Sequence, residues 1–364
     1  MKRKRPTLAE VARVAGVSVG TASRVLREVP GTRVSDSTRQ RIFRTADWLD
    51  YQANPAGRAL RTSKTGVIGL VVPDLRNVDQ LLMGVEKEAK NQGWTVFLAR
   101  IREGEDDISR VKEIFRGGYV DGLLIQSQES DPMRWAAAFT AGEHPLVFVN
   151  SINDGEFGTV SLDDVSGMSN ITKYLLSKGH RRIAFIGGDR ASASSPRRLE
   201  GYVSAMERHG VGVLTKLIVE TGYTSDAGRL GMRALYESGH EFTALAVANV
   251  NSAIGALGEA HRLGLRVPEK VSFAAFNDSW AAANTWPPLT TLMMPMARVG
   301  SQAVQMLSRH LRDGFVEHQI VDDVSPVLIE RESVVSFVRD SFRSESPVQC
   351  HTQQESRILE EKNV

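Results

Sequence analysis

The sequence is poor in cysteine and has no long hydrophobic run. Cys350 is the only cysteine among 364 residues, which excludes an internal disulfide and a thiolate metal cluster and fits a reducing compartment. No apolar stretch approaches the roughly 20 residues of a membrane-spanning helix. The basic start, Lys2 to Arg5, is not followed by the apolar segment of a secretory signal. We therefore expect a cytoplasmic protein with no membrane partner, metal or cofactor.

Charge is unevenly distributed along a chain whose net charge is only +2. Residues 1–64 contain 14 lysines and arginines and 5 acidic residues, whereas the other 300 contain 31 and 38. A basic head on an acidic body indicates a polyanion partner for the head alone. The length allows two or three domains.

Residues 7–26 have the pattern of two short amphipathic helices joined by a turn at Gly16. Thr7 and Glu10 have the spacing of a capping box, and Ser18 can cap the second helix. The expected apolar positions, at helical spacing, are Leu8, Val11, Ala12, Ala15, Ala22, Val25 and Leu26. The other side of the second helix has small, polar or basic residues: Val19, Gly20, Thr21, Ser23 and Arg24. Such a face can enter a DNA major groove; the alternative is an ordinary helical hairpin in a core.

A third helix, capped by Ser35, is expected to complete a headpiece of residues 1–50 around Ile42, Phe43, Ala46 and Leu49. A hinge of residues 51–65 follows, in which Asn54 and Pro55 begin a helix of about seven residues, too short to be stable alone. Arg58 and Arg61 favour a phosphate partner, and Leu60 has the character of a minor-groove wedge. The alternative is a plain polar linker.

From Gly66 onward, apolar strands alternate with amphipathic helices. The expected strands are 67–72, 95–99, 122–125, 146–150, 159–162, 183–186, 217–220, 244–248, 271–276 and 291–294. Expected helices include 81–92, 168–178, 198–208, 225–238 and 252–263. Continuous apolar runs are typical of parallel strands covered on both faces. We expect a doubly wound α/β body over 66–338, in two lobes with a cleft at the carboxyl ends of the strands. Residues 339–364 are expected to be a disordered tail, without the heptads of a coiled-coil tetramer.

These blocks resemble the LacI/GalR family of bacterial transcription repressors. The resemblance runs from Thr7 to about Val335, and its most specific part is LAEVARVAGVSVGTASRVL, followed by NPAGRALRT and GVIGLVVPD. Further blocks are GHRRIAFIGG, RLEGY, GLRVPEKVSFAAFND and PPLTTLMMP. The resemblance implies a helix-turn-helix headpiece with a hinge helix, followed by a periplasmic-binding-protein-like body.

The resemblance also implies a homodimer on a near-palindromic double-stranded DNA operator, kinked at its centre by paired hinge helices. Residues whose positions imply base contacts are Val19, Gly20 and Arg24. Residues whose positions imply contacts to the DNA backbone, or support for them, are Thr7, Ser18, Thr21, Ser23 and Asn54. Leu60 matches the family's intercalating leucine.

A small-molecule effector in the cleft is implied less specifically. The candidate residues are Arg76, Asn150, Arg198, Tyr223, Asn249 and Asn277. Asn150 and Asn277 stand where the family often has aspartate, and Val250 replaces the aspartate of an Asn-Asp pair. Amides in place of carboxylates, beside Arg198 and Arg76, move the expected cleft toward positive charge, so the expected effector is a sugar, a sugar acid or a sugar phosphate. The alternative is a pocket that is altered or lost.

Two other functions fit the sequence less well. Gly16 to Gly20 fits the G-x-S-x-G pattern of a hydrolase, but that motif needs a strand before the serine, and here a helix is expected. An enzyme on the α/β body lacks a visible nucleophile and base, and a transport-type binding protein needs a signal peptide. His180, after Gly179, is expected to be a local helix cap. The basic head favours a DNA-binding repressor and not an enzyme.

Overall fold

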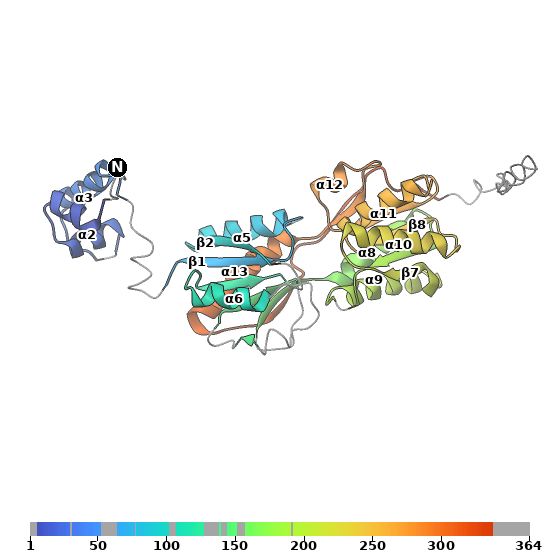
Figure 1. The fold of residues 1–364 in the computed structure, drawn as a ribbon, viewed down its shortest axis with the longest axis horizontal. Coiled ribbons are helices and arrows are strands. Elements are labelled where there is room, and N and C mark those ends of the chain that lie inside the picture. The colour runs from blue at the N-terminus through green and yellow to red at the C-terminus, as the bar shows by residue number, and fades with distance from the viewer. Residues whose placement is uncertain are drawn as a thin grey trace, which may run out of the picture. The chain divides into compact units, whose positions relative to one another are not determined.

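The computed structural model describes residues 6–29, 31–51, 64–76, 78–101, 107–126, 138–139, 144–150, 157–190 and 192–337. The chain divides into two compact units (Figure 1). The first consists of residues 1–162 and 295–321, and the second of residues 163–294 and 322–364. The chain therefore passes from one unit to the other three times, after Leu162, Met294 and Val321.

The headpiece is a three-helix cluster formed by α1 (Leu8–Val14), α2 (Val19–Leu26) and α3 (Asp36–Trp48). Gly16 ends the first helix with φ of +65°, a conformation that favours glycine. A small core holds the helices together, consisting of Ala12, Ala15, Ala22, Val25 and Ile42, with Leu8, Leu26 and Phe43 packed against it. The predicted apolar faces of the first two helices are confirmed.

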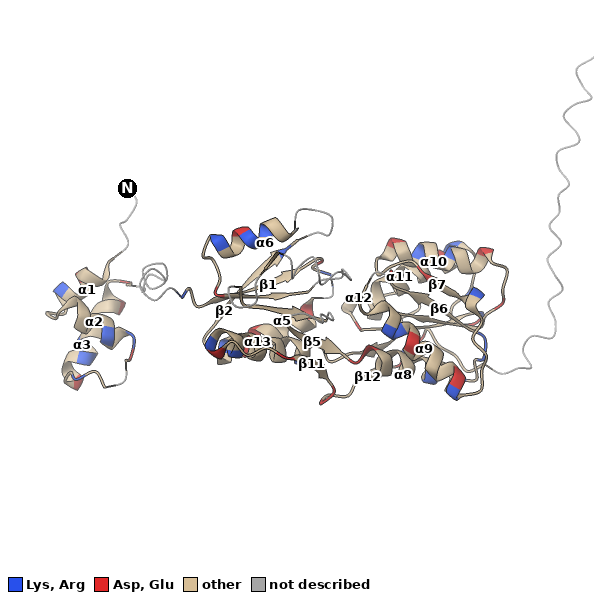
Figure 2. Cartoon of the chain, turned by 90° about the horizontal axis from the view of Figure 1, so that it is seen from below, with Lys and Arg blue, Asp and Glu red and all other residues tan. Residues whose placement is uncertain are grey.

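The first unit contains a six-stranded parallel sheet in the order β11-β5-β4-β3-β1-β2. Its strands are β1 (Val67–Val72), β2 (Thr95–Arg100), β3 (Gly122–Ile125), β4 (Leu146–Val149), β5 (Gly158–Leu162) and β11 (His318–Val321). Its helices are α5 (Asp79–Asn91), α6 (Asp107–Arg116) and α13 (Met296–Asp313). Helices α5 and α13 pack on one face and α6 on the other (Figure 2). Burial on both faces accounts for continuous apolar strands such as β1.

The second unit repeats this plan with the strand order β12-β10-β9-β8-β6-β7, in which only the β10–β12 pair is antiparallel. Its strands are β6 (Ile183–Gly187), β7 (Ile218–Glu220), β8 (Ala244–Val247), β9 (Ser272–Phe276), β10 (Thr290–Met293) and β12 (Val327–Ile329). Its helices are α8 (Asp164–Ser177), α9 (Ser195–Arg208), α10 (Ser225–Glu237), α11 (Val250–Arg262) and the short α12 (Trp280–Ala283).

Both units contain pairs of helices that approach closely through glycine. In the first unit, a Cβ on Gly84 of α5 would lie 1.9 Å from the carbonyl oxygen of Ala297 in α13. In the second, a Cβ on Gly255 of α11 would lie 1.9 Å from the carbonyl oxygen of Ser225 in α10. These contacts require glycine because any side chain would overlap the neighbouring backbone.

The last described segment returns to the second unit and is held there by polar contacts that are buried or half-buried. Arg331 makes two hydrogen bonds to the Asp278 carboxylate, at 2.8 and 3.0 Å. His180 is buried, with Nδ1 2.9 Å from Thr243 Oγ1 and Nε2 3.0 Å from the carbonyl oxygen of Val335. The His180 amide donates a hydrogen bond to the carbonyl oxygen of Leu175 at 3.3 Å, as expected of a local cap of α8, whereas its side chain has partners that are distant in sequence.

All ten predicted strands are present with ends within one residue of those expected. The apolar pattern does not predict β11 and β12, which are only partly buried. No helix in the described ranges is both long and apolar enough to cross a membrane.

Candidate DNA-binding surface and effector site

Helix α2 has one buried side and one accessible side. Ala22 and Val25 are completely buried, whereas Val19 is 48% exposed and Gly20 and Arg24 are exposed as well. The side chain of Ser23 is half-buried. The face expected to read DNA is therefore accessible, because the core takes up the opposite side of the helix.

Three of the predicted backbone-contacting residues lie at helix N-termini. The Thr7 hydroxyl accepts a hydrogen bond from the Glu10 amide at 3.3 Å, and the Glu10 carboxylate accepts one from the Thr7 amide at 2.7 Å. The Ser18 hydroxyl accepts a hydrogen bond from the Thr21 amide at 3.0 Å and lies 2.8 Å from the Thr21 hydroxyl. The amide groups of a helix N-terminus favour phosphate, so these positions suit contacts to a DNA backbone.

Gly20 lies in α2 although the fold does not require glycine there. A Cβ at this position would meet only Ser18 Oγ, at 3.8 Å, and no positive φ is recorded for Gly20. Glycine is less favourable than alanine within a helix. Since neither the packing nor the backbone conformation requires glycine here, its small size is consistent with the close approach of another molecule to α2.

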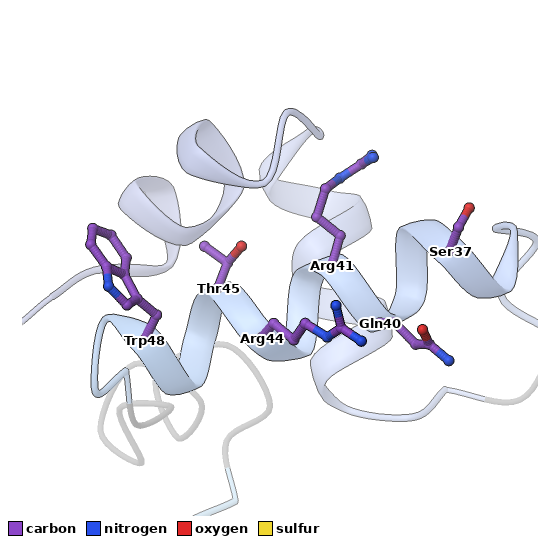
Figure 3. Close-up of a pocket in the computed structure, with 6 residues that line it drawn as sticks. All are labelled: Ser37, Gln40, Arg41, Arg44, Thr45 and Trp48. Carbon is purple, nitrogen blue, oxygen red and sulfur yellow. The ribbon is translucent and has the colours of Figure 1, made fainter.

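Helix α3 supports the turn that precedes α2. Arg41 donates a hydrogen bond from Nε to the carbonyl oxygen of Ala15 at 3.0 Å, which fixes the end of α1. Figure 3 shows Arg41, Arg44 and Trp48 projecting from α3, and Trp48 is 76% exposed. Arginines on the headpiece helices give this part of the chain its basic character (Figure 2).

The hinge candidates Asn54, Arg58 and Leu60 lie outside the described residues. Beyond the hinge, Asp121 accepts hydrogen bonds from the amides of Thr65 and Gly66 at 2.7 and 2.9 Å. The chain that follows the hinge is thus fixed to the first unit by one carboxylate.

Arg198 is the centre of a buried polar cluster in the second unit. Its Nε donates to Asp164 Oδ1 at 2.9 Å and its Nη1 to the carbonyl oxygen of Ala248 at 2.6 Å. Arg198 and Asp164 are each 2% exposed. The guanidinium carbon lies 3.9 Å from the ring centroid of Phe276 and 5.2 Å from that of Tyr223. The charge of Arg198 is therefore balanced inside the protein.

The other effector candidates of the second unit differ in their free hydrogen-bonding capacity. The Tyr223 hydroxyl lies 2.9 Å from Ser194 Oγ. Asn249 caps α11 by accepting a hydrogen bond from the Asn251 amide at 2.8 Å. Asn277 follows β9 with φ of +67°, and its buried side-chain oxygen has no partner among the described residues.

The first unit has a similar asparagine and a second paired arginine. Asn150 follows β4 with φ of +54°, and its buried side-chain oxygen also lacks a partner in the described ranges. Arg76 donates from Nε to Asp74 Oδ2 at 2.7 Å. Both asparagines therefore stand at carboxyl ends of parallel strands, where ligands bind in open α/β sheets, each with an unfilled acceptor.

Comparison with known proteins finds matches for both the headpiece and the α/β body. The family of bacterial regulatory proteins named after lacI matches residues 7–54, and a periplasmic-binding-protein-like domain matches residues 172–334. The regulator CelR of Thermobifida fusca is 30% identical over 319 residues, covering 84% of this chain and 92% of CelR. The chain belongs to the LacI family. This LacI-family protein is a DNA-binding transcriptional regulator and not an enzyme.

Other relatives agree with this assignment. Catabolite control protein A of Priestia megaterium is 28% identical over 86% of this chain and 95% of its own length. A LacI-family regulator structure from Mycobacterium smegmatis is 34% identical, with a TM-score of 0.69 over 74% of this chain and 99% of that one. The CelR–cellobiose complex is 28% identical, with a TM-score of 0.66 over 90% of this chain and 100% of that one.

Asp164 and Ser194 belong to the polar cluster of this LacI-family protein, although the motifs do not identify them as effector-site residues. Asp164 follows the helix-capping Asp163, which is a local signal of a helix start and not of an ion pair. An anionic effector would require the charges of Arg76 and Arg198 to be uncompensated. In the structure Asp74 and Asp164 balance them.

Proposed function

We propose that the chain is a repressor that binds a near-palindromic operator as a homodimer in the cytoplasm. Each headpiece places α2 in the major groove of one half-site. The observation that supports this most directly is the accessible face of Val19, Gly20 and Arg24 opposite the buried Ala22 and Val25. Its small side chains allow the helix backbone to come close to the base pairs.

Arg24 is the main direct reader in this proposal. Its guanidinium can donate two hydrogen bonds to one guanine, whereas Val19 and Gly20 offer few hydrogen bonds. The hydroxyl groups that contact the phosphates are those of Thr7, Ser18 and Thr21 at the helix starts and of Ser23 within α2. The hinge residues Asn54, Arg58 and Leu60 complete the site at the operator centre, a role that rests on the sequence.

Selection of binding sites from random double-stranded DNA tests this proposal. We expect enrichment of a near-palindrome, and Arg24→Ala should reduce affinity for it by about 1–3 kcal/mol with a much smaller effect on random DNA. Arg13→Ala, which removes an exposed arginine of α1, is the matched control and should retain the preference. Failure to enrich any sequence, or an equal loss on both DNAs, would contradict the proposed reading role.

We also propose a neutral, polyhydroxylated effector at the carboxyl ends of the strands. The unfilled side-chain oxygens of Asn150 and Asn277 can accept hydrogen bonds from hydroxyl groups. Asp74 pairs with Arg76 in the first unit and Asp164 with Arg198 in the second, so neither arginine offers an anion an uncompensated charge. The similarity to CelR, a relative with a cellobiose complex, supports a carbohydrate.

Calorimetric titration with neutral sugars, sugar acids and sugar phosphates tests the effector class. We expect saturable binding of a neutral sugar, weakened at least about tenfold by Asn277→Ala through the loss of its hydrogen bonds. Tight binding of the acids or phosphates alone would support an anionic effector instead.

A further inference from the structure

The chain enters the first unit at Thr65 and Gly66, and the Asp121 carboxylate holds both residues. Thr65 and Gly66 come directly before β1, and Asp121 comes directly before β3. Asp121 Oδ1 accepts hydrogen bonds from the Thr65 amide at 2.7 Å and the Thr65 hydroxyl at 3.0 Å. Asp121 Oδ2 accepts one from the Gly66 amide at 2.9 Å. These three hydrogen bonds form the Asp121 clasp, which uses both oxygens of the carboxylate.

Further contacts fix the backbone on either side of the clasp. Gly66 has φ of +73°, a conformation that favours glycine, and its carbonyl oxygen accepts from the Thr95 amide at 2.9 Å. The Asp121 amide donates to the carbonyl oxygen of Val67 at 2.7 Å. The Thr65 hydroxyl also accepts from the Val67 amide, at 3.0 Å. The direction in which the chain leaves the sheet is therefore determined by residues at the starts of β1, β2 and β3.

The clasp depends on a carboxylate and not only on a polar side chain. Three donors converge on the two oxygens of Asp121, whereas an amide side chain has only one oxygen that can accept. Hydrogen bonds to an ionised group are also stronger than those between neutral groups. Asp121, Thr65 and Gly66 are half-buried, so donors that lose the carboxylate can turn to water. Loss of the clasp should therefore loosen two residues without unfolding the unit.

We propose that Asp121 is a positioning residue for operator binding, which acts through the chain segment that connects each headpiece to its first unit. The inference rests on the proposed binding of a dimer to a near-palindromic operator, which needs two headpieces at a fixed spacing. Residues 51–65 make the covalent connection, and the clasp holds the last of them, Thr65, together with Gly66. Because these two residues are ordered before DNA binds, less backbone entropy is lost when the complex forms.

Fluorescence anisotropy titrations of the full chain with a selected operator and with random DNA test the proposal. In Asp121→Asn the side-chain nitrogen cannot accept a hydrogen bond, so the clasp is broken. We expect the dissociation constant for the operator to rise about tenfold, because the freed residues must be ordered on binding. Binding to random DNA depends on phosphate contacts and needs no fixed spacing of the headpieces, so its dissociation constant should not change.

Glu113→Gln is the matched control for charge. It removes an exposed carboxylate of α6 and changes the net charge by the same amount as Asp121→Asn. Both DNAs should bind this variant as they bind the wild type. Urea unfolding of each variant verifies that it is folded under the conditions of the titration.

Two variants of Thr65 test the clasp from its other side. Thr65→Ser keeps the hydroxyl and should bind the operator as the wild type does. Thr65→Val keeps the branched shape but removes the hydroxyl, and should raise the dissociation constant for the operator about threefold. In the double variant Asp121→Asn/Thr65→Val the loss should be smaller than the product of the single losses, because both substitutions remove the same hydrogen bond.

The outcomes distinguish this inference from the proposed function. Wild-type operator affinity in Asp121→Asn and Thr65→Val, equal losses on operator and random DNA, or fully multiplicative losses in the double variant would each overturn the positioning role alone. Absence of operator binding by the wild type would overturn it together with the proposed function.

Discussion

Asp164 accepts a hydrogen bond of 2.9 Å from Arg198, and both side chains are about 2% exposed. The pair connects α8 to α9, and Arg198 extends the connection to Ala248 after β8. A buried charge is tolerated when it is paired and hydrogen-bonded. The residue that the family resemblance assigns to the effector is therefore also part of the internal structure of the second unit.

Substitution of Asp164 by alanine should lower the free energy of unfolding much more than the same substitution of Asp163. Asp164→Ala leaves the Arg198 charge buried without its partner, so we expect a loss of about 3–5 kcal/mol in the free energy of unfolding. Asp163→Ala removes a helix cap, in which Asp163 accepts from the Ser166 amide at 2.9 Å, and should cost about 1 kcal/mol. Urea unfolding of the two variants measures the difference. Equal losses in the free energy of unfolding would show that the Arg198–Asp164 ion pair contributes no more to stability than the helix cap.

Gly20→Ala should separate stability from DNA binding. The fold has room for the added methyl group, so we expect unfolding to become harder by up to about 1 kcal/mol. The same methyl group would stand between α2 and the bases, so operator affinity should fall about tenfold, or about 1.4 kcal/mol. Thermal unfolding and gel-shift titration give the two values. An unchanged operator affinity would mean that α2 does not approach DNA through this residue.

Two glycines of α11 should respond to alanine in opposite directions. Gly255 contacts the backbone of α10, and a Cβ there would overlap Ser225, so Gly255→Ala should destabilise the protein by about 1–3 kcal/mol or more. Gly258 has nothing within 4 Å of its Cβ position, so Gly258→Ala should stabilise it by about 0.5–1 kcal/mol. Chemical unfolding tests both. A similar change in both variants would rule out close helix packing as the cause.

His180 should make stability depend on pH. Burial lowers the pKa of His180, and the nearby charge of Arg181 lowers it further, against the effect of the hydrogen bond to Val335. A carbonyl oxygen can only accept, so Nε2 holds the proton of the neutral ring. The unfolded chain then binds more protons below its ordinary pKa of about 6.5, and stability falls as the pH decreases from there.

The variant His180→Asn should therefore differ most from the wild type above pH 6.5. The difference in the free energy of unfolding should narrow as the pH falls toward 5.5, because only the wild type loses the contribution of the neutral ring. Unfolding curves at several pH values measure this difference. A constant difference across the range would exclude the proposed titration.

The sequence predicts the elements of this fold better than their arrangement. Strands such as β1 are buried on both faces, so an apolar run marks them to within one residue. Strand β11 has exposed positions and pairs with β5, more than 150 residues earlier, and no local pattern indicates such a pairing. Helix caps at Thr7, Ser18 and Ser35 are predicted correctly because they depend on residues three positions apart.

In the candidate DNA-binding and effector sites, too, the sequence predicts local features but not contacts between distant residues. The accessible face of α2 follows from helical spacing alone. The pairing of Arg198 with Asp164 joins residues 34 positions apart, and it reverses the charge argument that the sequence suggests.

The threefold passage of the chain between the units determines when each unit can be completed during synthesis. The first unit needs α13 and β11, which end at residue 321, although its other strands end at residue 162. Nearly the whole second unit is therefore synthesised before the first unit has all its helices and strands. A chain terminated after Met294 would lack α13, so Gly84 and the apolar side of α5 would have no partner. Premature termination should therefore damage the unit made first, and such chains should be removed by proteolysis as incomplete proteins.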